Sequence, residues 1–160
     1  MIQARVITCS DGAFHGSRVD KSGPAVRALL EGNGYAVDLV TVVPDDVDEI
    51  ATAIENAVGD GARLVVTTGG TGLAPRDVTP EATMRVAERV VPGFGEVMRA
   101  KSTTKMAALS RAIAATRGGS LIVNLPGSVN GATECLNAVL ELIPHAVELL
   151  AGGRVEQHPG

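Results

Sequence analysis

The first half of the chain alternates short continuous apolar runs with segments whose apolar residues recur at helical spacing. The runs at residues 2–9, 37–43 and 64–67 are short and rich in Val, Ile and Leu, which predicts buried strands. Residues 10–21 form a polar, glycine-containing stretch that predicts a loop. Two amphipathic helices are predicted between the strands, with these apolar faces: Val26, Leu29 and Leu30, then Val47, Ile50, Ile54 and Val58.

The second half predicts two further helices, a hairpin and a long final helix. A helix is expected from Thr79 to about Val90, a break at residues 92–96, and helical structure again to about Met106. Two apolar runs flank Arg117-Gly118-Gly119 and predict the hairpin, at residues 112–116 and 120–125. The last helix is predicted at about residues 132–150, followed by a frayed tail at 152–160.

Strands alternating with helices predict right-handed βαβ units. We therefore expect an α/β fold, a three-layer α/β/α sandwich with a mostly parallel sheet, forming a single domain over residues 1–151. Ligands of such sheets bind at the carboxyl ends of the strands. The loops that follow strands, at residues 10–12, 44–45, 69–72 and 126–127, are therefore expected to face one pocket.

The most distinctive of these loops is the turn Thr67-Thr68-Gly69-Gly70-Thr71-Gly72. Glycine lets main-chain N–H groups converge on a ligand, and Thr68 and Thr71 add hydroxyl donors, so the turn suits a phosphate. It matches neither the Walker loop, which needs a following Gly-Lys-Ser/Thr, nor the dinucleotide fingerprint G-x-G-x-x-G. A simple connection between a strand and a helix is the alternative interpretation.

Two aspartates stand near the expected ligand edge. Asp77 follows the glycine turn and Asp45 follows the second strand. Each carboxylate is suited either to holding Mg²⁺ or to an ordinary role at the start of a helix. Ser10, Asp11 and Ser128 are similarly plausible ligand contacts and common turn residues.

Composition narrows the function classes. The chain has 160 residues, 45% hydrophobic but only 2% aromatic, and a formal net charge of −4, which argues against a nucleic-acid binder. Cys9 and Cys135 have no metal-binding spacing and are expected to be reduced core residues. No apolar run approaches the length of a membrane span, so we expect no membrane partner and a soluble cytoplasmic protein.

Charge is unevenly distributed. The segment Arg99–Arg117 carries five basic residues and no acid. Lys101 and Lys105 lie one helical turn apart and, with Ser110, could receive an anionic second substrate, although a solvated face is the default for such a run. The three histidines are isolated, so a hydrolase triad has no support.

Eight short motifs occur in an order that resembles the MogA/MoaB family of molybdenum-cofactor biosynthesis proteins, the molybdopterin adenylyltransferases, and the G domain of gephyrin. The motifs are Ser10-Asp11, Asp20 with Ser22-Gly23-Pro24, Pro44-Asp45-Asp46, the glycine turn 67–72, Arg76-Asp77-Val78-Thr79-Pro80-Glu81, Pro92-Gly93-Phe94-Gly95-Glu96, Leu109-Ser110-Arg111 and Leu125-Pro126-Gly127-Ser128. The resemblance covers residues 2–150.

This resemblance implies a reaction and its parts. ATP and molybdopterin would be the substrates, with AMP transferred to the terminal phosphate of the pterin and pyrophosphate released. By motif match, Asp45 and Asp77 would be catalytic and hold Mg²⁺. The nucleotide and pterin would lie against Gly69, Gly70, Thr71, Gly72, Pro126, Gly127 and Ser128, with Ser110 at a pterin contact. A homotrimer, and a separate protein that inserts molybdate, are also implied.

Two positions depart from the family pattern. Val129 stands where a proline often follows, with Ser128 closer to the MoaB-like form, and Gly12 replaces a larger, often basic residue. The alternatives are therefore a MoaB-like pterin-binding protein or carrier without efficient adenylyl transfer, and an oligomerising scaffold module.

Overall fold

Six strands form one sheet in the order β2-β1-β3-β6-β5-β4 in the computed structural model, which describes residues 1–152. The strands are β1 (Gln3–Cys9), β2 (Ala36–Val43), β3 (Leu64–Thr68), β4 (Arg89–Val90), β5 (Ala114–Arg117) and β6 (Ser120–Leu125). β2, β1, β3 and β6 pair in parallel, whereas β5 is antiparallel to β6 and β4 is antiparallel to β5. The predicted mostly parallel sheet and its hairpin are confirmed.

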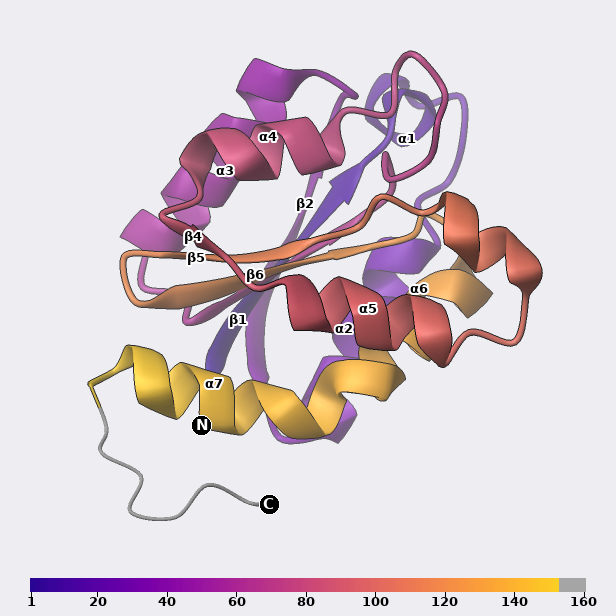
Figure 1. The fold of residues 1–160 in the computed structure, drawn as a ribbon. Helices are drawn as coiled ribbons and strands as arrows, with labels where there is room; N and C mark the ends of the chain where they lie inside the picture. Colours follow the sequence, from indigo (N-terminus) through magenta and orange to yellow (C-terminus); the bar gives the residue numbers. More distant parts are fainter. Residues whose placement is uncertain (153–160) are drawn as a thin grey trace.

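Helices cover both faces of this sheet (Figure 1). They are α1 (Asp11–His15), α2 (Ser22–Gly32), α3 (Val47–Gly59), α4 (Thr79–Val86), α5 (Pro92–Ala100), α6 (Val129–Val139) and α7 (Ile143–Leu150), with 3-10 turns η1 (Lys105–Leu109) and η2 (Leu140–Leu142). α3 and α4 pack on one face and α2, α5, α6 and α7 on the other, which confirms the three-layer sandwich. Within residues 1–152, no helix combines the length and apolarity needed to cross a bilayer.

The alternation of side chains along each strand divides the core into two halves. In β3, Leu64 and Val66 pack into the cluster under α2, α5, α6 and α7, whereas Val65 packs into the cluster under α3 and α4. All three side chains are fully buried. A strand buried on both faces has no polar side, which is why its sequence is a continuous apolar run rather than an alternating one.

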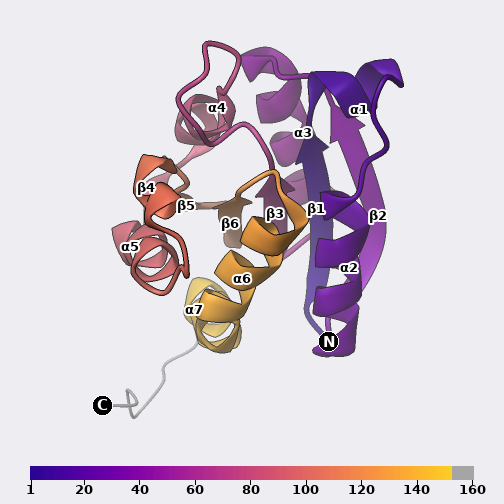
Figure 2. The ribbon, with the colours of Figure 1, turned by 90° about the vertical axis from the view of Figure 1, so that its right-hand side faces the viewer.

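The strand register brings the loops together at one edge. Thr8 of β1 is opposite Thr68 of β3, and Thr68 is in turn opposite Leu125 of β6. The chain leaves β1 toward β2 on one side and returns to β3 on the other, so the connections after β1 and β3 diverge and leave a crevice. Figure 2 shows β1, β2 and β3 pointing toward the same end of the sheet, where α1 lies.

Two expectations for the loops and helices before residue 92 were wrong. The predicted polar loop 10–21 contains α1, whose first turn is capped by the Ser10 hydroxyl accepting from the Ala13 N–H at 3.1 Å. The helix expected to reach Val90 ends at Val86, because the next residues join the sheet as β4, with the Glu88 N–H donating to the Thr116 carbonyl.

Three further differences concern the helices after residue 91, and prolines contribute to two of them. Pro92 begins α5 instead of breaking a helix, since its fixed φ suits the first helical position. The helical segment expected to reach Met106 ends at Ala100, and η1 follows. The single last helix is two, because η2 intervenes and Pro144 lies in the first turn of α7. The predicted frayed tail falls on residues 153–160, which lie outside the described residues, apart from Gly152.

Asn124 of β6 ties the sheet to α4, and replacing it should destabilise the fold. Its buried amide donates to the hydroxyls of Thr67 (3.0 Å) and Thr83 (2.9 Å). Asn124→Ala leaves both buried hydroxyls without this donor, so we expect a loss of about 2–4 kcal/mol in the free energy of unfolding, measured by chemical denaturation. The exposed Asn137→Ala is the control, and equal stability of both variants would contradict the assignment.

Candidate functional site

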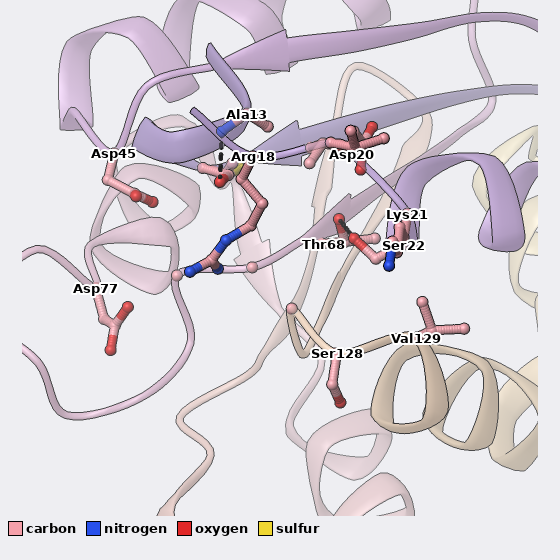
Figure 3. A pocket seen from close by; sticks show the side chains of 17 residues that line it. Ala13, Arg18, Asp20, Lys21, Ser22, Asp45, Thr68, Asp77, Ser128 and Val129 are labelled. Atoms are coloured by element: carbon pink, nitrogen blue, oxygen red, sulfur yellow. Dashed lines mark hydrogen bonds between the residues drawn. The ribbon is translucent and has the colours of Figure 1, made fainter. Parts of the chain in front are cut away.

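A cavity of about 760 Å³ opens at the carboxyl ends of the parallel strands. Its walls come from the ends of β1 and β3 and from the segments that follow β1, β2, β3 and β6 (Figure 3). The lining residues that matter below are Ser10, Arg18, Lys21, Asp45, Thr68, Gly69, Gly70, Asp77, Gly127 and Ser128. The convergence expected from the strand order therefore occurs.

A reciprocal pair of aspartates fastens the loops after β1 and β2. The Asp11 N–H donates to Oδ2 of Asp45, and the Asp45 N–H donates to Oδ1 of Asp11, both at 2.9 Å. Arg76, from the loop after β3, donates Nε and a terminal N–H to the two oxygens of Asp11, at 2.8 and 3.0 Å. These contacts hold three loops that are distant in sequence in one arrangement.

Asp45 keeps one oxygen without a partner. Its Oδ1 is buried and makes no hydrogen bond within the described residues. Burial raises the pKa of the Asp45 carboxyl above its ordinary value, and the negative charges of Asp11 and Asp77 act in the same direction. A buried carboxylate oxygen without a donor is costly to the fold, so a bound cation is the partner that would stabilise it.

Asp77 approaches the same region from the other side of the glycine turn. Its Oδ2 accepts from the Ala74 N–H at 3.0 Å, which shapes the loop before α4. The side chain is not the cap of α4, whose N-cap is Val78. A Cβ placed on Gly72 would lie 2.8 Å from Oδ2 of Asp77, and one on Gly70 would lie 3.3 Å from Oδ1 of Asp45, so both carboxylates face the turn.

The turn requires glycine at two positions. Gly69 and Gly70 have φ of 90° and 69°, and a Cβ would come within 2.3 Å of the Cys9 carbonyl oxygen and of the Thr79 hydroxyl oxygen respectively. Thr79, the first residue of α4, donates its hydroxyl to the Gly69 carbonyl at 2.9 Å and its N–H to the Gly70 carbonyl at 3.1 Å. The turn is therefore bare of side chains and rigidly held.

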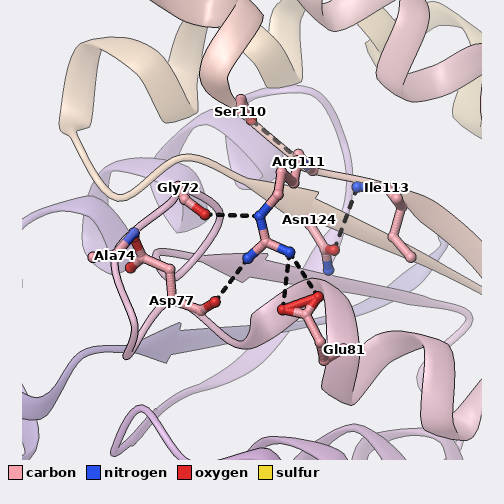
Figure 4. A network of polar contacts seen from close by, with 9 residues as sticks. Gly72, Ala74, Asp77, Glu81, Ser110, Arg111, Ile113 and Asn124 are labelled. Atoms are coloured by element: carbon pink, nitrogen blue, oxygen red, sulfur yellow. Dashed lines mark hydrogen bonds and ion pairs between the residues drawn. The ribbon is translucent and has the colours of Figure 1, made fainter.

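Arg111 fixes the segment that follows the turn (Figure 4). Its side chain donates to the carbonyls of Gly72 (2.8 Å) and Asp77 (2.7 Å), and its main-chain N–H donates to the Thr71 carbonyl at 2.8 Å. The remaining guanidinium donor engages both carboxylate oxygens of Glu81, at 2.9 and 2.7 Å. Arg111 therefore acts on the backbone of the loop, and not as part of a substrate-binding basic face.

Two helices direct their N-termini at the cavity. Ser22, at the start of α2, shares a hydrogen bond of 2.9 Å with the Thr68 hydroxyl, and Ser128 caps α6 by accepting from the Gly131 N–H at 3.0 Å. Arg18 and Lys21 add positive charge to the lining. Helix dipoles and cations together favour an anionic ligand.

A second, smaller cavity of about 170 Å³ adjoins the first at Ser128. Met98, Met106, Ala107 and Cys135 give it a largely apolar lining, to which Ser110 and Pro126 also contribute. Ser110 and Pro126 therefore lie beside the large cavity and do not line it. The large cavity is thus the more polar of the two and the small one the more apolar, and Ser128 lines both.

The cysteines fit the expectation of reduced core residues. Both are free thiols, Cys9 buried and Cys135 partly buried. Burial raises the pKa of Cys9 to about 12, so the thiol stays protonated on the cavity floor and is no nucleophile.

The predicted site residues fall into three groups. Those in the large cavity are Ser10, Asp45, Thr68, Gly69, Gly70, Asp77, Gly127 and Ser128. Ser110 and Pro126 line the second cavity, together with Ser128. Asp11, Thr71 and Gly72 lie behind the lining: the Asp11 carboxylate is engaged by Asp45 and Arg76, and the carbonyls of the other two accept from Arg111. That any of them contacts a ligand stays a prediction.

The residues present could supply only some of the ligands of a magnesium ion. No cluster of three or more His, Cys, Asp or Glu side chains occurs within residues 1–152. Mg²⁺ is commonly held by one or two carboxylates with waters and substrate phosphates. Asp45, with its unpartnered oxygen, and Asp77 match that donor set.

The cations Arg18 and Lys21 were not among the predicted site residues. Both lie in the segment after β1, which the strand order already places at the ligand edge, so the position of this loop was the available signal. The basic stretch that was considered instead is mostly structural. Arg99 donates to the carbonyls of Ser110 and Ala112. Lys101 and Lys105 do not share a helix, because Lys101 is the residue after the end of α5 and Lys105 begins η1.

Comparison with known proteins supports the fold and identifies the family. The family described as the probable molybdopterin binding domain matches residues 5–145. The structure of MoaB, a molybdopterin biosynthesis enzyme from Thermus thermophilus, superposes with a TM-score of 0.89 at 46% identity, covering 95% of this chain and 98% of that one. The chain belongs to the MogA/MoaB family.

Relatives in this family differ in length. A molybdopterin adenylyltransferase of Helicobacter pylori is 40% identical, covering 97% of this chain and 91% of the relative. The Drosophila melanogaster molybdenum cofactor synthesis protein cinnamon is also 40% identical, but the match covers 91% of this chain and only 25% of that protein. The MogA/MoaB fold thus occurs both nearly alone and as a part of larger proteins.

The ion pair between Arg76 and Asp11 gives a pH-dependent signature. The hydrogen bonds from Arg76 are the main cause that lowers the pKa of Asp11 from 3.8 to about 2. The pKa of Asp11 is lower in the folded protein than in the unfolded chain, so its ionisation stabilises the fold fully at pH values above the pKa of the unfolded state. This contribution is lost as the pH falls through the folded pKa of about 2. We expect carboxyl NMR titration to find Asp11 near 2, and Arg76→Met to move it toward about 4. Arg85→Met is the control, and an Asp11 that titrates near 4 in the unaltered protein would contradict the pairing.

Arg111→Lys should loosen the loop at residues 71–78. Lysine keeps the charge but cannot donate to two carbonyls and a carboxylate in the fixed fork of a guanidinium. We expect amide hydrogen exchange in this loop to become roughly 10- to 100-fold faster, which corresponds to the loss of about 1–3 kcal/mol. Arg85→Lys is the control, and amide exchange in the loop 71–78 should stay unchanged in it. The exchange rates of the β1 amides should stay unchanged in both variants.

Proposed function

We propose that this protein is a molybdopterin adenylyltransferase of molybdenum cofactor biosynthesis. It would transfer AMP from ATP to the terminal phosphate of molybdopterin and release pyrophosphate. The observation that carries the proposal is the buried, unpartnered oxygen of Asp45, which faces the glycine turn, as does Asp77, in a cavity that is also lined by the cations Arg18 and Lys21. The name of the 40% identical Helicobacter pylori relative supports the same reaction.

The proposed reaction needs alignment and charge neutralisation more than a protein nucleophile. An oxygen of the pterin phosphate attacks the α-phosphorus of ATP, and the bond from that phosphorus to the pyrophosphate oxygen breaks. Asp45 and Asp77 would hold Mg²⁺, which supplies charge neutralisation to the phosphates when bound. The bare turn at Gly69 and Gly70 lets phosphate oxygens approach the main chain, and the starts of α2 and α6 add positive dipole ends.

The pterin would occupy the second cavity. Its apolar lining suits the ring system, and Ser110 offers a hydroxyl there. The terminal phosphate of the pterin would then reach the first cavity past Ser128, which lines both. The two reacting groups would then lie on opposite sides of Ser128, an arrangement suited to in-line attack.

The cellular setting forms part of the same proposal. We expect a cytoplasmic homotrimer that passes the adenylylated pterin to a separate molybdate-inserting protein. Neither a nucleic acid nor a membrane is an expected partner, consistent with the net charge of −4 and the low aromatic content.

Replacing either aspartate should remove turnover while preserving pterin binding. Asp45→Asn and Asp77→Asn keep the shape of the side chain but remove the charge that the metal needs, so we expect the rate of adenylylated pterin formation to fall about 10²- to 10³-fold or more. The pterin Kd should change by less than about threefold, because the pterin lies in the other cavity. Chelation of divalent ions should abolish turnover in the unaltered protein, and added Mg²⁺ should restore it.

Asp48→Asn, which removes a surface carboxylate of α3, is the matched control. Normal turnover by Asp77→Asn would refute the proposed role. Tight pterin binding without pyrophosphate release by the unaltered protein would instead identify a carrier, and the absence of pterin binding would favour a scaffold.

A further inference from the structure

The loop after α1 folds back onto Gly12. α1 is followed by its C-cap residue Gly16, whose φ of 83° reverses the chain. The Arg18 N–H then donates to the Gly12 carbonyl at 3.1 Å, and the Ser17 hydroxyl donates to the same carbonyl at 3.3 Å. Arg18 is thereby held beside the first turn of α1, at the mouth of the large cavity.

Gly12 provides the space that the Arg18 side chain occupies. A Cβ on Gly12 would lie 3.2 Å from Cβ and 3.8 Å from Nε of Arg18. The backbone of Gly12 has no positive φ, so glycine is not needed there for conformation. Its missing side chain instead leaves room for the arginine stem, which crosses Gly12 and enters the cavity (Figure 3).

The guanidinium is available for a ligand. No hydrogen bond or ion pair engages it among residues 1–152. Figure 3 shows it between the two metal-binding candidates, Asp45 and Asp77, and the wall formed by Ser128. The third lining acid, Asp20, is already occupied, because its two oxygens accept from the Thr8 hydroxyl (2.9 Å) and the Gly23 N–H (3.1 Å).

A triphosphate at this place brings more negative charge than one divalent ion neutralises. A guanidinium presents paired donors that match phosphate oxygens, and it does so more strongly than a neutral donor. The pterin phosphate would enter from the opposite side, past Ser128, so the nucleotide is the substrate that Arg18 faces.

We propose that Arg18, seated on Gly12, binds the phosphates of the nucleoside triphosphate and sets the affinity for that substrate. This inference rests on the proposed function for the identity of the ligand. Gly12 and Arg18 act together in this proposal: Arg18 binds the phosphates, and Gly12 contributes only the space that the arginine side chain occupies.

Equilibrium binding tests the assignment without turnover. The probe is the Mg²⁺ complex of an ATP analogue with a methylene bridge between the α and β phosphorus atoms, titrated calorimetrically. We expect Arg18→Ala to weaken its binding roughly 10- to 100-fold and Arg18→Lys to weaken it about 3- to 10-fold. Gly12→Leu should behave like Arg18→Ala, because its side chain takes the space of the arginine stem. The pterin Kd should stay within about threefold in all three variants.

Arg27→Ala is the control, since it removes the same charge from the outer face of α2, where Arg27 pairs with Glu31. The inference would be overturned if Arg18→Ala bound the analogue as tightly as the control does. It would also be overturned if Arg18→Ala lost affinity for the pterin and not for the analogue. Either result would leave the proposed function standing. If the unaltered protein binds the analogue through Arg18 but forms no adenylylated pterin, the proposed function fails and the inference holds. If the unaltered protein does not bind the analogue, both fail.

Discussion

The reciprocal contact between Asp11 and Asp45 is the constraint on which the site depends. Each backbone N–H binds the carboxylate of the other residue, and Arg76 neutralises Asp11 from a third loop. Parallel strands bring loops to one edge but do not fix how side chains meet there. This contact does so, because it uses one oxygen of Asp45 and leaves the other directed at the glycine turn without a partner.

The site is held in a state that is unfavourable by itself. A buried carboxylate oxygen lacks a donor, and it lies beside a turn that has no room for side chains at Gly69 and Gly70. The compensation lies in the hydrogen bonds around it: Thr79 holds the turn from α4, and Arg111 holds the following segment from the connection between η1 and β5. Local stability is therefore concentrated behind the cavity, where it can preorganise the site for a charged ligand.

The sequence was sufficient for the layers, the strand directions and most of the cavity lining. Apolar runs and glycine turns at strand ends follow from general rules, so Asp45, Gly69 and Gly127 could be placed at one edge. Side-chain direction in an irregular segment follows no such period. Arg18 enters the cavity only because α1 forms and the chain reverses at Gly16, and Arg111 finds its carbonyl partners only once the sheet is assembled. Pro92 was misjudged because proline both ends and begins helices.

Arg76 and Arg111, the two arginines that hold the loops of the site, differ in their exposure to solvent. The Arg76 side chain is 65% exposed, so dissolved salt screens its attraction to Asp11. Arg111 acts largely on carbonyl dipoles and is less sensitive to such screening. Ionic strength thus acts selectively: concentrated electrolyte weakens the link between the loop after β3 and the loop after β1, while the contacts of Arg111 keep the shape of the segment that carries Asp77.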